Sequence, residues 1–287
     1  MDDADRAFAI AEAASRAGGR PAERMAVLRA RDGRIERVSD AVAAEEPLEI
    51  RLDGERVAVT MRTPAPGEDA ELALGFLLGE GILGDAAEVA RVVECGGGAD
   101  GGAVDVRLRA GASPAAGWQR NFYATSSCGI CGKASVDAVR VAAGTVAPGP
   151  SLEAGILLGL PERLRRAQRV FDRTGGLHAA GVFSPRGELI VMREDVGRHN
   201  AVDKAIGRAA MDDLMPLQEA VLQVSGRASF EIVQKAAMAG VPIVAAVSAP
   251  SSLAVELAAD SGMTLVGFLR REGYNVYAGA ERIDGLA

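Results

Sequence analysis

The last third of the chain alternates short apolar runs with helical segments, and this pattern constrains the fold more than any other feature. The apolar runs are 220–224, 242–247 and 264–269, and segments with helical spacing lie between them. Apolar strands that alternate with helices of about ten residues form parallel β-α-β units whose two faces are both covered. We therefore predict an α/β domain at residues 121–287.

The first third of the chain predicts strands. A β-prone stretch contains two turn pairs, Asp32-Gly33 and Asp53-Gly54, which are typical of hairpins. We interpret residues 25–120 as a β-rich subdomain, so that the fold class is α/β (α+β overall). Residues 1–24 are acidic at the start and predict a loosely ordered extension.

Two further segments of the first third carry predictions. Residues 67–83 have acidic residues at the start and apolar residues at helical spacing, so they predict an amphipathic helix. The glycine-rich stretch 95–102 predicts a turn that Cys95 opens, and an alternating strand follows it.

Composition restricts the class of protein. Hydrophobic residues make up 48% of the 287 residues and charged residues 25%, as in ordinary globular proteins. A formal charge of -7 argues against a general binder of nucleic acid or membrane surfaces. The chain has no secretory hydrophobic stretch and no apolar run of membrane-spanning length. We expect a cytoplasmic protein whose thiols are reduced.

Polar turns follow the three apolar runs of the last third. They are the segments 225–229, 248–252 and 270–277, which are rich in small, hydroxyl and arginine residues. Ligands of open α/β sheets bind beyond the carboxyl ends of the strands, and helix starts and arginines favour phosphate. These turns predict a site for a phosphorylated or nucleotide-bearing ligand. The alternative is that Ser229 and Ser251 only cap helices.

Residues 181–195 predict two strands around the turn 185–187, and residues 200–211 predict a helix. The segment 193–204 packs charged residues and a histidine between the second strand and this helix. Two interpretations remain equally open. The segment lies at a strand end, where sites form, or it is a solvated helix start with Asp195 or Asn200 near the cap.

Cys128 and Cys131 are two of only three cysteines in the chain. With His178 and His199 they reach the four ligands of a structural zinc site, but the histidines lack the spacing of a zinc knuckle. A thioredoxin-like dithiol is the second interpretation. The third is a sulfur relay, in which the flanking glycines give access and Lys133 favours a thiolate. The residues alone leave zinc and sulfur relay comparable.

The loop TSSCGICGKAS resembles the signature of the formate dehydrogenase accessory sulfurtransferases, the FdhD family. Other segments are similar to that family in the same order, and the resemblance covers roughly residues 25–285. They are TMRTPAPGEDAELALGFLLGEGI, TGGLHAAGVF, REDVGRHNAVDKAIG, SGRASFEIVQKAAMAGVPIVAAVSAPSSLAVELA and GFLRREGYNVY.

The resemblance implies a function. Such proteins pass sulfur from a cysteine desulfurase to the molybdenum (or tungsten) bis-molybdopterin guanine dinucleotide cofactor, which formate dehydrogenase then uses. It implies that Cys128 bears the persulfide, that Cys131 is the second thiol, and that the protein is a homodimer. It also implies a three-layer C-terminal domain similar to cytidine deaminases. Because the residues of zinc deaminases are missing, we expect no structural metal.

The resemblance further implies that a segment near the C-terminus binds the guanine dinucleotide. In this sequence the segment is Phe268, Leu269, Arg270, Arg271, Glu272 and Gly273. One departure is visible, because Gly279-Ala280 stands where the family has a His-Pro pair. The alternative function is a zinc-stabilised nucleotide- or cofactor-binding module without sulfur transfer.

Overall fold

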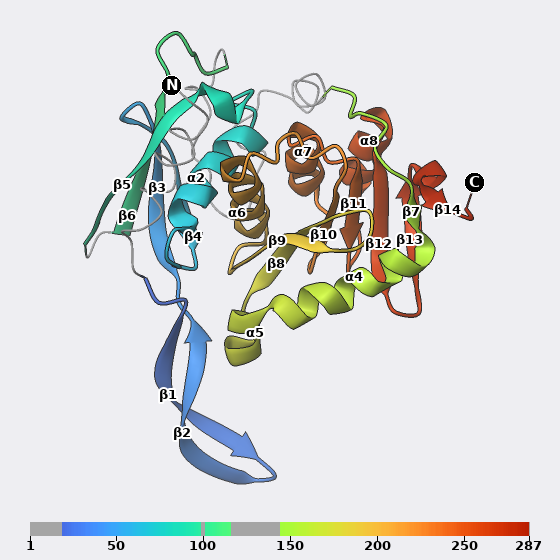
Figure 1. The fold of residues 1–287 in the computed structure, drawn as a ribbon. Coiled ribbons are helices and arrows are strands. Elements are labelled where there is room, and N and C mark those ends of the chain that lie inside the picture. The colour runs from blue at the N-terminus through green and yellow to red at the C-terminus, as the bar shows by residue number, and fades with distance from the viewer. Residues whose placement is uncertain (1–18, 99–100, 116–143, 287) are drawn as a thin grey trace.

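The computed structural model describes residues 19–98, 101–115 and 144–286 (Figure 1). A six-stranded sheet with the order β13-β12-β11-β10-β8-β9 forms its centre. The strands are β8 (His178–Phe183), β9 (Leu189–Asp195), β10 (Val221–Val224), β11 (Ile243–Ala246), β12 (Thr264–Arg270) and β13 (Gly273–Ala278). The strands β10, β11 and β12 are parallel, as the alternation predicts, whereas β8, β9 and β13 are antiparallel to their neighbours.

Helices cover both faces of this sheet, so the C-terminal part has three layers. The helices α6 (Arg198–Met211), α7 (Phe230–Met238) and α8 (Ser252–Asp260) lie on one face. The helix α4 (Ala154–Ala167) crosses the other face, and the short α5 (Arg169–Thr174) follows it (Figure 1). Alternate strand residues divide between the two layers, since Leu222 packs towards α6 and Val221 towards α4. The three-layer prediction is confirmed, and the similarity to cytidine deaminases stays a prediction.

The remaining small elements extend this part of the molecule. The strand β7 (Leu152–Glu153) pairs with β14 (Ile283–Asp284), and a short 3-10 helix at Ala280–Arg282 precedes β14. Within the described ranges, no helix is long and apolar enough to cross a membrane.

The N-terminal part is rich in strands, as predicted. A four-stranded sheet has the order β4-β3-β6-β5, and a separate hairpin of β1 and β2 projects from the body as an arm (Figure 1). These strands are β1 (Ala22–Arg31), β2 (Arg34–Ala43), β3 (Glu46–Leu52), β4 (Glu55–Arg62), β5 (Val89–Gly98) and β6 (Gly101–Leu108). A 3-10 helix at Ala86–Glu88 precedes β5.

The turn pairs behave as predicted, and one prediction about a turn is wrong. Asp32 and Gly33 both have a positive φ, of 51° and 73°, which suits the tight turn of a right-twisted hairpin. Cys95 does not open a turn, because β5 continues to Gly98 and pairs with β6. The thiol of Cys95 is exposed near the end of that strand.

The helix α2 (Glu68–Gly79) joins the two parts of the chain. It was predicted as amphipathic, but it is buried on almost all sides, including Asp69 and Glu71. The reason is that the N-terminal sheet covers one side and α6 covers the other, and one hydrophobic cluster continues through both parts. A helix with apolar or paired residues all round is the expected form for such a position.

The helices α2 and α6 meet at two glycines. A Cβ atom added to Gly75 would lie 1.8 Å from the carbonyl oxygen of Asp203, and one added to Gly207 would lie 1.8 Å from that of Glu71. At these distances the backbones are in direct contact, and any side chain would push the helices apart. The pair of glycines therefore sets how closely the two parts pack.

We predict that Gly75→Ala and Gly207→Ala each lower the free energy of unfolding by about 3 kcal/mol or more, because overpacking forces backbone shifts. Gly155→Ala is the matched control, since that glycine is also helical and an added Cβ has no atom within 4 Å. We expect the control variant to have the same free energy of unfolding as the natural chain, or a slightly higher one. Denaturant unfolding of the three variants measures the difference, and equal midpoints for all three would contradict the contact.

Candidate functional site

The polar turns at the carboxyl ends of the strands lie side by side. The N–H of Ser248 donates to the oxygen of Gly226 (3.2 Å), and that of Ser251 donates to the oxygen of Ala228 (3.0 Å). The N–H of Phe268, beyond the third strand, donates to the oxygen of Ser248 (3.1 Å). The turns 225–229 and 248–252 therefore lie side by side, whereas the predicted third turn, 270–277, is mostly the strand β13.

A cavity of about 550 Å³ opens at this edge, on the face that α4 covers. It lies beyond the ends of β10 and β11, where ligands of α/β sheets bind. Its lining residues are Pro161, Leu164, Arg165, Gln168, Phe171, Gly175, Gly176, Leu177, His178, Ser225 and Val247. Apolar walls with a few polar groups are typical of a site for a small molecule or cofactor.

His178 is the titratable group at the inner end of the cavity. Burial lowers the pKa of His178, and the positive charge of Arg198 lowers it further, so the imidazole is neutral at pH 7. A Cβ on Gly226 would lie 3.3 Å from Nδ1, so this glycine lets the turn pass closely over the ring. A neutral imidazole presents one donor and one acceptor to a ligand.

The serine hydroxyl groups in the turns 225–229 and 248–252 have different hydrogen-bond partners. Ser251 Oγ accepts the N–H of Ala254 (3.3 Å) and caps α8, so the capping interpretation is confirmed there. Ser229 makes no side-chain cap at α7 and instead bonds to Nε2 of His199 (3.0 Å). Ser225 Oγ accepts the N–H of Ala179 (2.9 Å), which leaves its own proton for donation into the cavity.

Two buried polar groups near this edge have no hydrogen-bond partner among the described residues. They are Nε of Arg198 and the side-chain amide of Gln223. Gln223 lies two residues before Ser225 on the same strand, so both side chains are on the α4 face. Buried donors and acceptors are almost always satisfied in folded proteins. Neither residue is among those that line the cavity.

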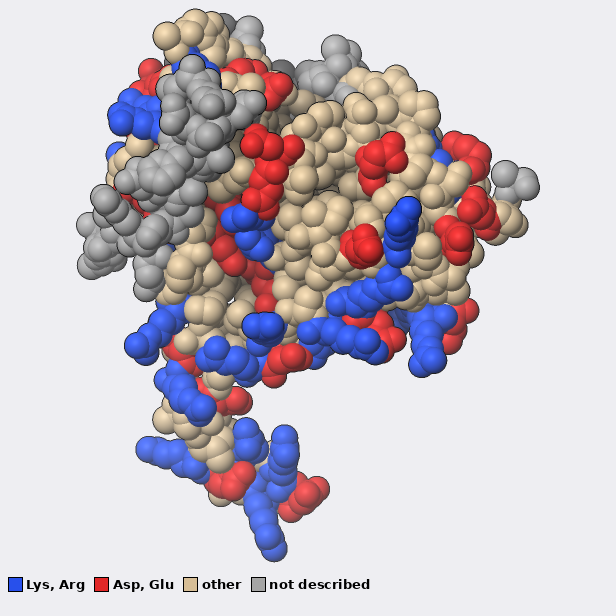
Figure 2. All heavy atoms as spheres, in the orientation of Figure 1, with Lys and Arg blue, Asp and Glu red and all other residues tan. Residues whose placement is uncertain are grey.

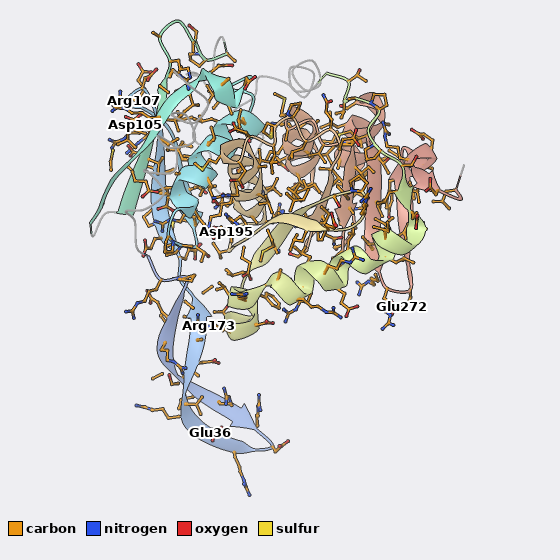
Figure 3. The ribbon with its side chains drawn as sticks, viewed as in Figure 1. Glu36, Asp105, Arg107, Arg173, Asp195 and Glu272 are labelled. Atoms are coloured by element: carbon orange, nitrogen blue, oxygen red, sulfur yellow. The ribbon has the colours of Figure 1, made fainter. Side chains whose placement is uncertain are left out.

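The predicted cofactor segment forms the hairpin between β12 and β13. Phe268 adopts a positive φ of 51° and is exposed, at the point where the strand register shifts. The side chain of Leu269 is fully buried in the α4-side core, so it supports the turn. Arg270, Arg271 and Glu272 are exposed, and Figure 3 shows Glu272 at the hairpin tip. The binding role of the segment 268–273 stays a prediction.

The charged segment 193–204 is not a solvated helix start, because Asp195 and Lys204 are both 0% exposed. Asp195 accepts from Nζ of Lys204 (2.8 Å) and from the N–H of Thr63 (2.9 Å). Asn200 donates to the oxygen of Met61 (2.7 Å) and to Asp195 (3.1 Å). The segment therefore fastens the start of α6 to the strand β4, and Figure 3 shows Asp195 in the interior. Sequence reasoning missed this because the partners are more than 130 residues away.

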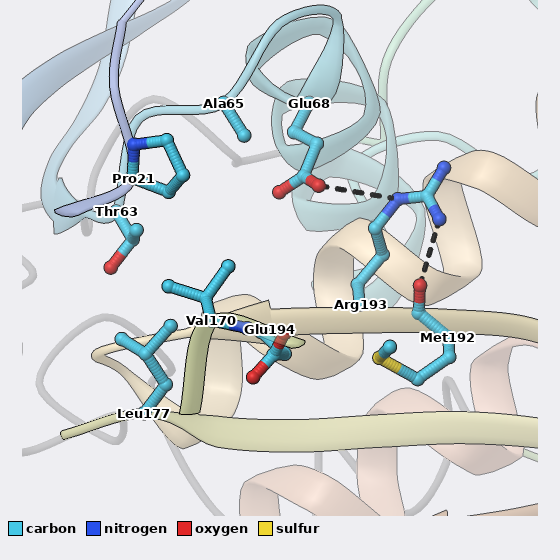
Figure 4. Close-up of a pocket in the computed structure, with 9 residues that line it drawn as sticks. All are labelled: Pro21, Thr63, Ala65, Glu68, Val170, Leu177, Met192, Arg193 and Glu194. Carbon is cyan, nitrogen blue, oxygen red and sulfur yellow. Dashed lines mark hydrogen bonds and ion pairs between the residues drawn. The ribbon is translucent and has the colours of Figure 1, made fainter. Parts of the chain in front are cut away.

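Glu194 continues this network towards α5. Its carboxylate accepts the N–H groups of Val170 (2.9 Å) and Phe171 (2.8 Å), which fixes the start of α5 against β9. It also lines a small cavity of about 80 Å³, drawn in Figure 4 with Glu68 and Arg193. Because Phe171 belongs to the wall of the larger cavity, this buried carboxylate helps to set the shape of the site.

Arg198 begins α6, beside both histidines of the chain. Its positive charge lowers the pKa of His178 and of His199, so the guanidinium lies near both rings. It forms no ion pair among the described residues. Gly197 precedes it and provides no side-chain cap, so the positive end of the helix dipole adds to the same region. Asp195 acts on the pKa of His178 and Glu231 on the pKa of His199 with the opposite sign, so this region carries charges of both signs.

Cys128, Cys131 and Lys133 lie outside the described residues. Their predicted roles therefore stay predictions. Within residues 19–98, 101–115 and 144–286, no three His, Cys, Asp or Glu side chains are grouped so that they could hold a metal ion.

The fold and site define a three-layer α/β protein with a cofactor-sized cavity at its strand ends, and solved structures include a similar one. A formate dehydrogenase accessory protein from Desulfotalea psychrophila matches with a TM-score of 0.74 at 25% identity, covering 92% of this chain and all of that chain. The FdhD/NarQ family model matches residues 43–284. The chain belongs to the FdhD/NarQ family.

Curated relatives agree with this assignment. A sulfur carrier protein FdhD from Streptomyces avermitilis is 58% identical over 92% of this chain and 96% of its own length. Proteins of the same name from Streptomyces coelicolor and Mycobacterium tuberculosis are 55% and 53% identical. They cover 92% and 85% of this chain, and 96% and 92% of their own lengths.

A pH dependence of stability follows from His199. Its pKa falls from 6.5 to about 4, because the ring is buried and because Arg198 and Lys235 lie nearby. Between these values the unfolded chain binds a proton that the folded chain does not, so acidification lowers stability. We predict that this residue contributes a loss of about 3 kcal/mol between pH 7 and pH 4. Urea unfolding at both pH values measures it.

The variant His199→Gln keeps a hydrogen-bonding side chain but removes the titrating group. Its stability therefore falls less on acidification than that of the natural chain. Parallel stability curves for the two proteins from pH 7 to pH 4 would contradict the assignment to His199.

Proposed function

We propose that this protein carries sulfur from a cysteine desulfurase to the molybdenum bis-molybdopterin guanine dinucleotide cofactor that formate dehydrogenase uses. The observation that carries the sulfur role is the 58% identity to a sulfur carrier protein over nearly the whole chain. The structural neighbour, an accessory protein of formate dehydrogenase, supports the recipient. The strand-end cavity supports the binding of a cofactor.

The chemistry needs a thiol that accepts sulfur and a means to release it. The thiolate of Cys128 attacks the terminal sulfur of the persulfide on the desulfurase, and the S–S bond of the donor breaks. This forms a persulfide on Cys128 and frees the thiolate of the donor. The thiolate of Cys131 then attacks Sγ of Cys128 and releases hydrosulfide for the acceptor. The two cysteines become a disulfide, which a cellular thiol reduces before the next cycle.

The site at the strand ends suits part of a guanine dinucleotide. Its volume of about 550 Å³ falls in the usual range for ligand pockets, and its walls are apolar enough to contact a ring system. His178 and Ser225 offer neutral hydrogen-bonding groups inside it. Arg198 and the start of α6, which lie beside His178 and outside the lining, add positive charge that favours phosphate. The exposed Arg270 and Arg271 follow at the rim, beyond Phe268.

The sulfur step is tested by mass spectrometry of the intact protein after incubation with a cysteine desulfurase and cysteine. We expect a gain of one sulfur in the natural chain, and loss of this gain in Cys128→Ala. Cys95→Ala is the matched control, because Cys95 is an exposed cysteine of the N-terminal sheet, and it gains sulfur normally. Restoration of formate dehydrogenase activity by Cys128→Ala, in a strain that lacks this protein, would contradict the role. Near-stoichiometric zinc would instead support the zinc-stabilised module.

The acceptor site is tested with GDP, which carries the guanine and phosphates of the cofactor. We predict that Arg198→Ala weakens GDP binding about tenfold, as expected for the loss of a charge-assisted hydrogen bond. Arg166→Ala is the control, because Arg166 is an exposed arginine of α4 that pairs with Glu162. Isothermal titration calorimetry measures both. Equal affinities of the two variants for GDP would contradict a role of Arg198 in binding.

A further inference from the structure

The arm formed by β1 and β2 has two chemically different faces. In the antiparallel register, Leu28 lies opposite Arg37 and Ala30 lies opposite Ile35. Alternation places these residues on one face of the ribbon. We call this the arm face, and its exposed residues are Arg24, Ala26, Leu28, Ala30, Ile35, Arg37 and Ser39.

The arm face combines apolar exposure with positive charge. Leu28 is 69% exposed and Ile35 is 73% exposed, which is unusual for neighbouring large apolar side chains. Arg24 and Arg37 flank them and have no ion-pair partner among the described residues. Within the fully described hairpin 22–43, every acidic residue of the two strands lies on the other face. Figure 2 shows the arm projecting into solvent with its basic side chains outward.

The opposite face differs in charge. It carries Glu23, Glu36 and Asp40 together with arginines, and Arg29 pairs there with Asp40 at 3.9 Å. The chain as a whole has a charge of -7, which disfavours a nucleic acid or an anionic membrane as the partner. The charge distribution therefore favours a protein partner that contacts one face only.

The base of the arm face joins the rim of the strand-end cavity. A Cβ on Gly176 would lie 3.5 Å from the Cβ of Ala43, which belongs to the same face. Gly176 is a lining residue of the cavity. The N–H of Ala44 also donates to the oxygen of Pro21 (3.1 Å), which closes the two strands at the base. Figure 3 shows Arg173 of α5 beside this junction. A partner on the arm face would therefore lie next to the cavity.

We propose that the arm face is the docking surface for the protein that donates sulfur, through an acidic surface with an apolar centre. This inference rests on the proposed function, because a persulfide passes between proteins only when the two thiols meet. Carboxylates of the donor would pair with Arg24 and Arg37, and its apolar centre would cover Leu28 and Ile35. A contact between the arm faces of two copies of this chain is disfavoured, since it would bury four arginines without an acid.

The test uses the full-length chain and a purified cysteine desulfurase. The charge variant Arg24→Glu/Arg37→Glu and the apolar variant Leu28→Ser/Ile35→Ser are expected to weaken binding about tenfold or more. The matched controls are Arg31→Glu/Arg34→Glu and Met25→Ser, which make similar changes on the opposite face. The controls bind the desulfurase within about twofold of the natural chain. Circular dichroism verifies that all variants are folded.

Sulfur loading separates docking from chemistry. In the two arm-face variants, the desulfurase concentration for half-maximal loading of Cys128 rises about tenfold, while the rate at saturation is unchanged. Unchanged half-saturation in both variants would overturn the docking surface and leave the proposed function intact. No loading of the natural chain at any desulfurase concentration would instead overturn the proposed function, and the docking surface with it. Analytical ultracentrifugation of the chain alone completes the test. If the natural chain and the controls are dimers and only the arm-face variants are monomers, the arm face is the contact with a second copy and the docking proposal is overturned.

Discussion

The direct contact between α2 and α6 is the constraint on which the rest of the structure depends. At Gly75 and Gly207 no side chain separates the two helices, so the backbone of one lies against the backbone of the other. The polar residues beside this contact are therefore forced into the interior. They remain stable there because each charge has a partner, as Lys235 has Asp203 and Glu80, both at 2.8 Å. Burial alone would disfavour such charges strongly.

The same contact positions the candidate site. It holds α6 against the N-terminal part, and the buried Asp195 and Lys204 fix the first turns of that helix. Arg198 is placed at the start of the helix, where its charge lowers the pKa of both histidines. A disturbance of the helix contact would thus change the electrostatics of the strand-end cavity without touching its lining. The proposed ligand binding would therefore depend on the same helix that stabilises the fold.

Three structural parts meet around the cavity: the turns at the strand ends, the helices α4 and α5, and the base of the arm. The parallel strands end in turns that bond to one another and form one side of the cavity. The helices α4 and α5 form the other side, and Glu194 anchors α5 through the N–H groups of Val170 and Phe171. The arm leaves the body at this junction and carries exposed apolar side chains away from it. The cavity and the base of the arm therefore lie at one edge of the described structure.

The sequence by itself determined the features that depend on neighbouring residues. Asp-Gly pairs set the hairpin turns, the alternation of apolar runs set the parallel strands, and the polar turns set the edge where the cavity lies. Tertiary structure decided the rest. The helix at 67–83 was predicted as amphipathic because its sequence does not reveal that α6 covers its second side. The segment 193–204 looked equally suited to solvent, because its partners in β4 and α2 are distant in the chain. Only the packed structure shows which charges are paired, and that Nε of Arg198 has no hydrogen-bond partner within the described part of the chain, since pairing depends on distance in space.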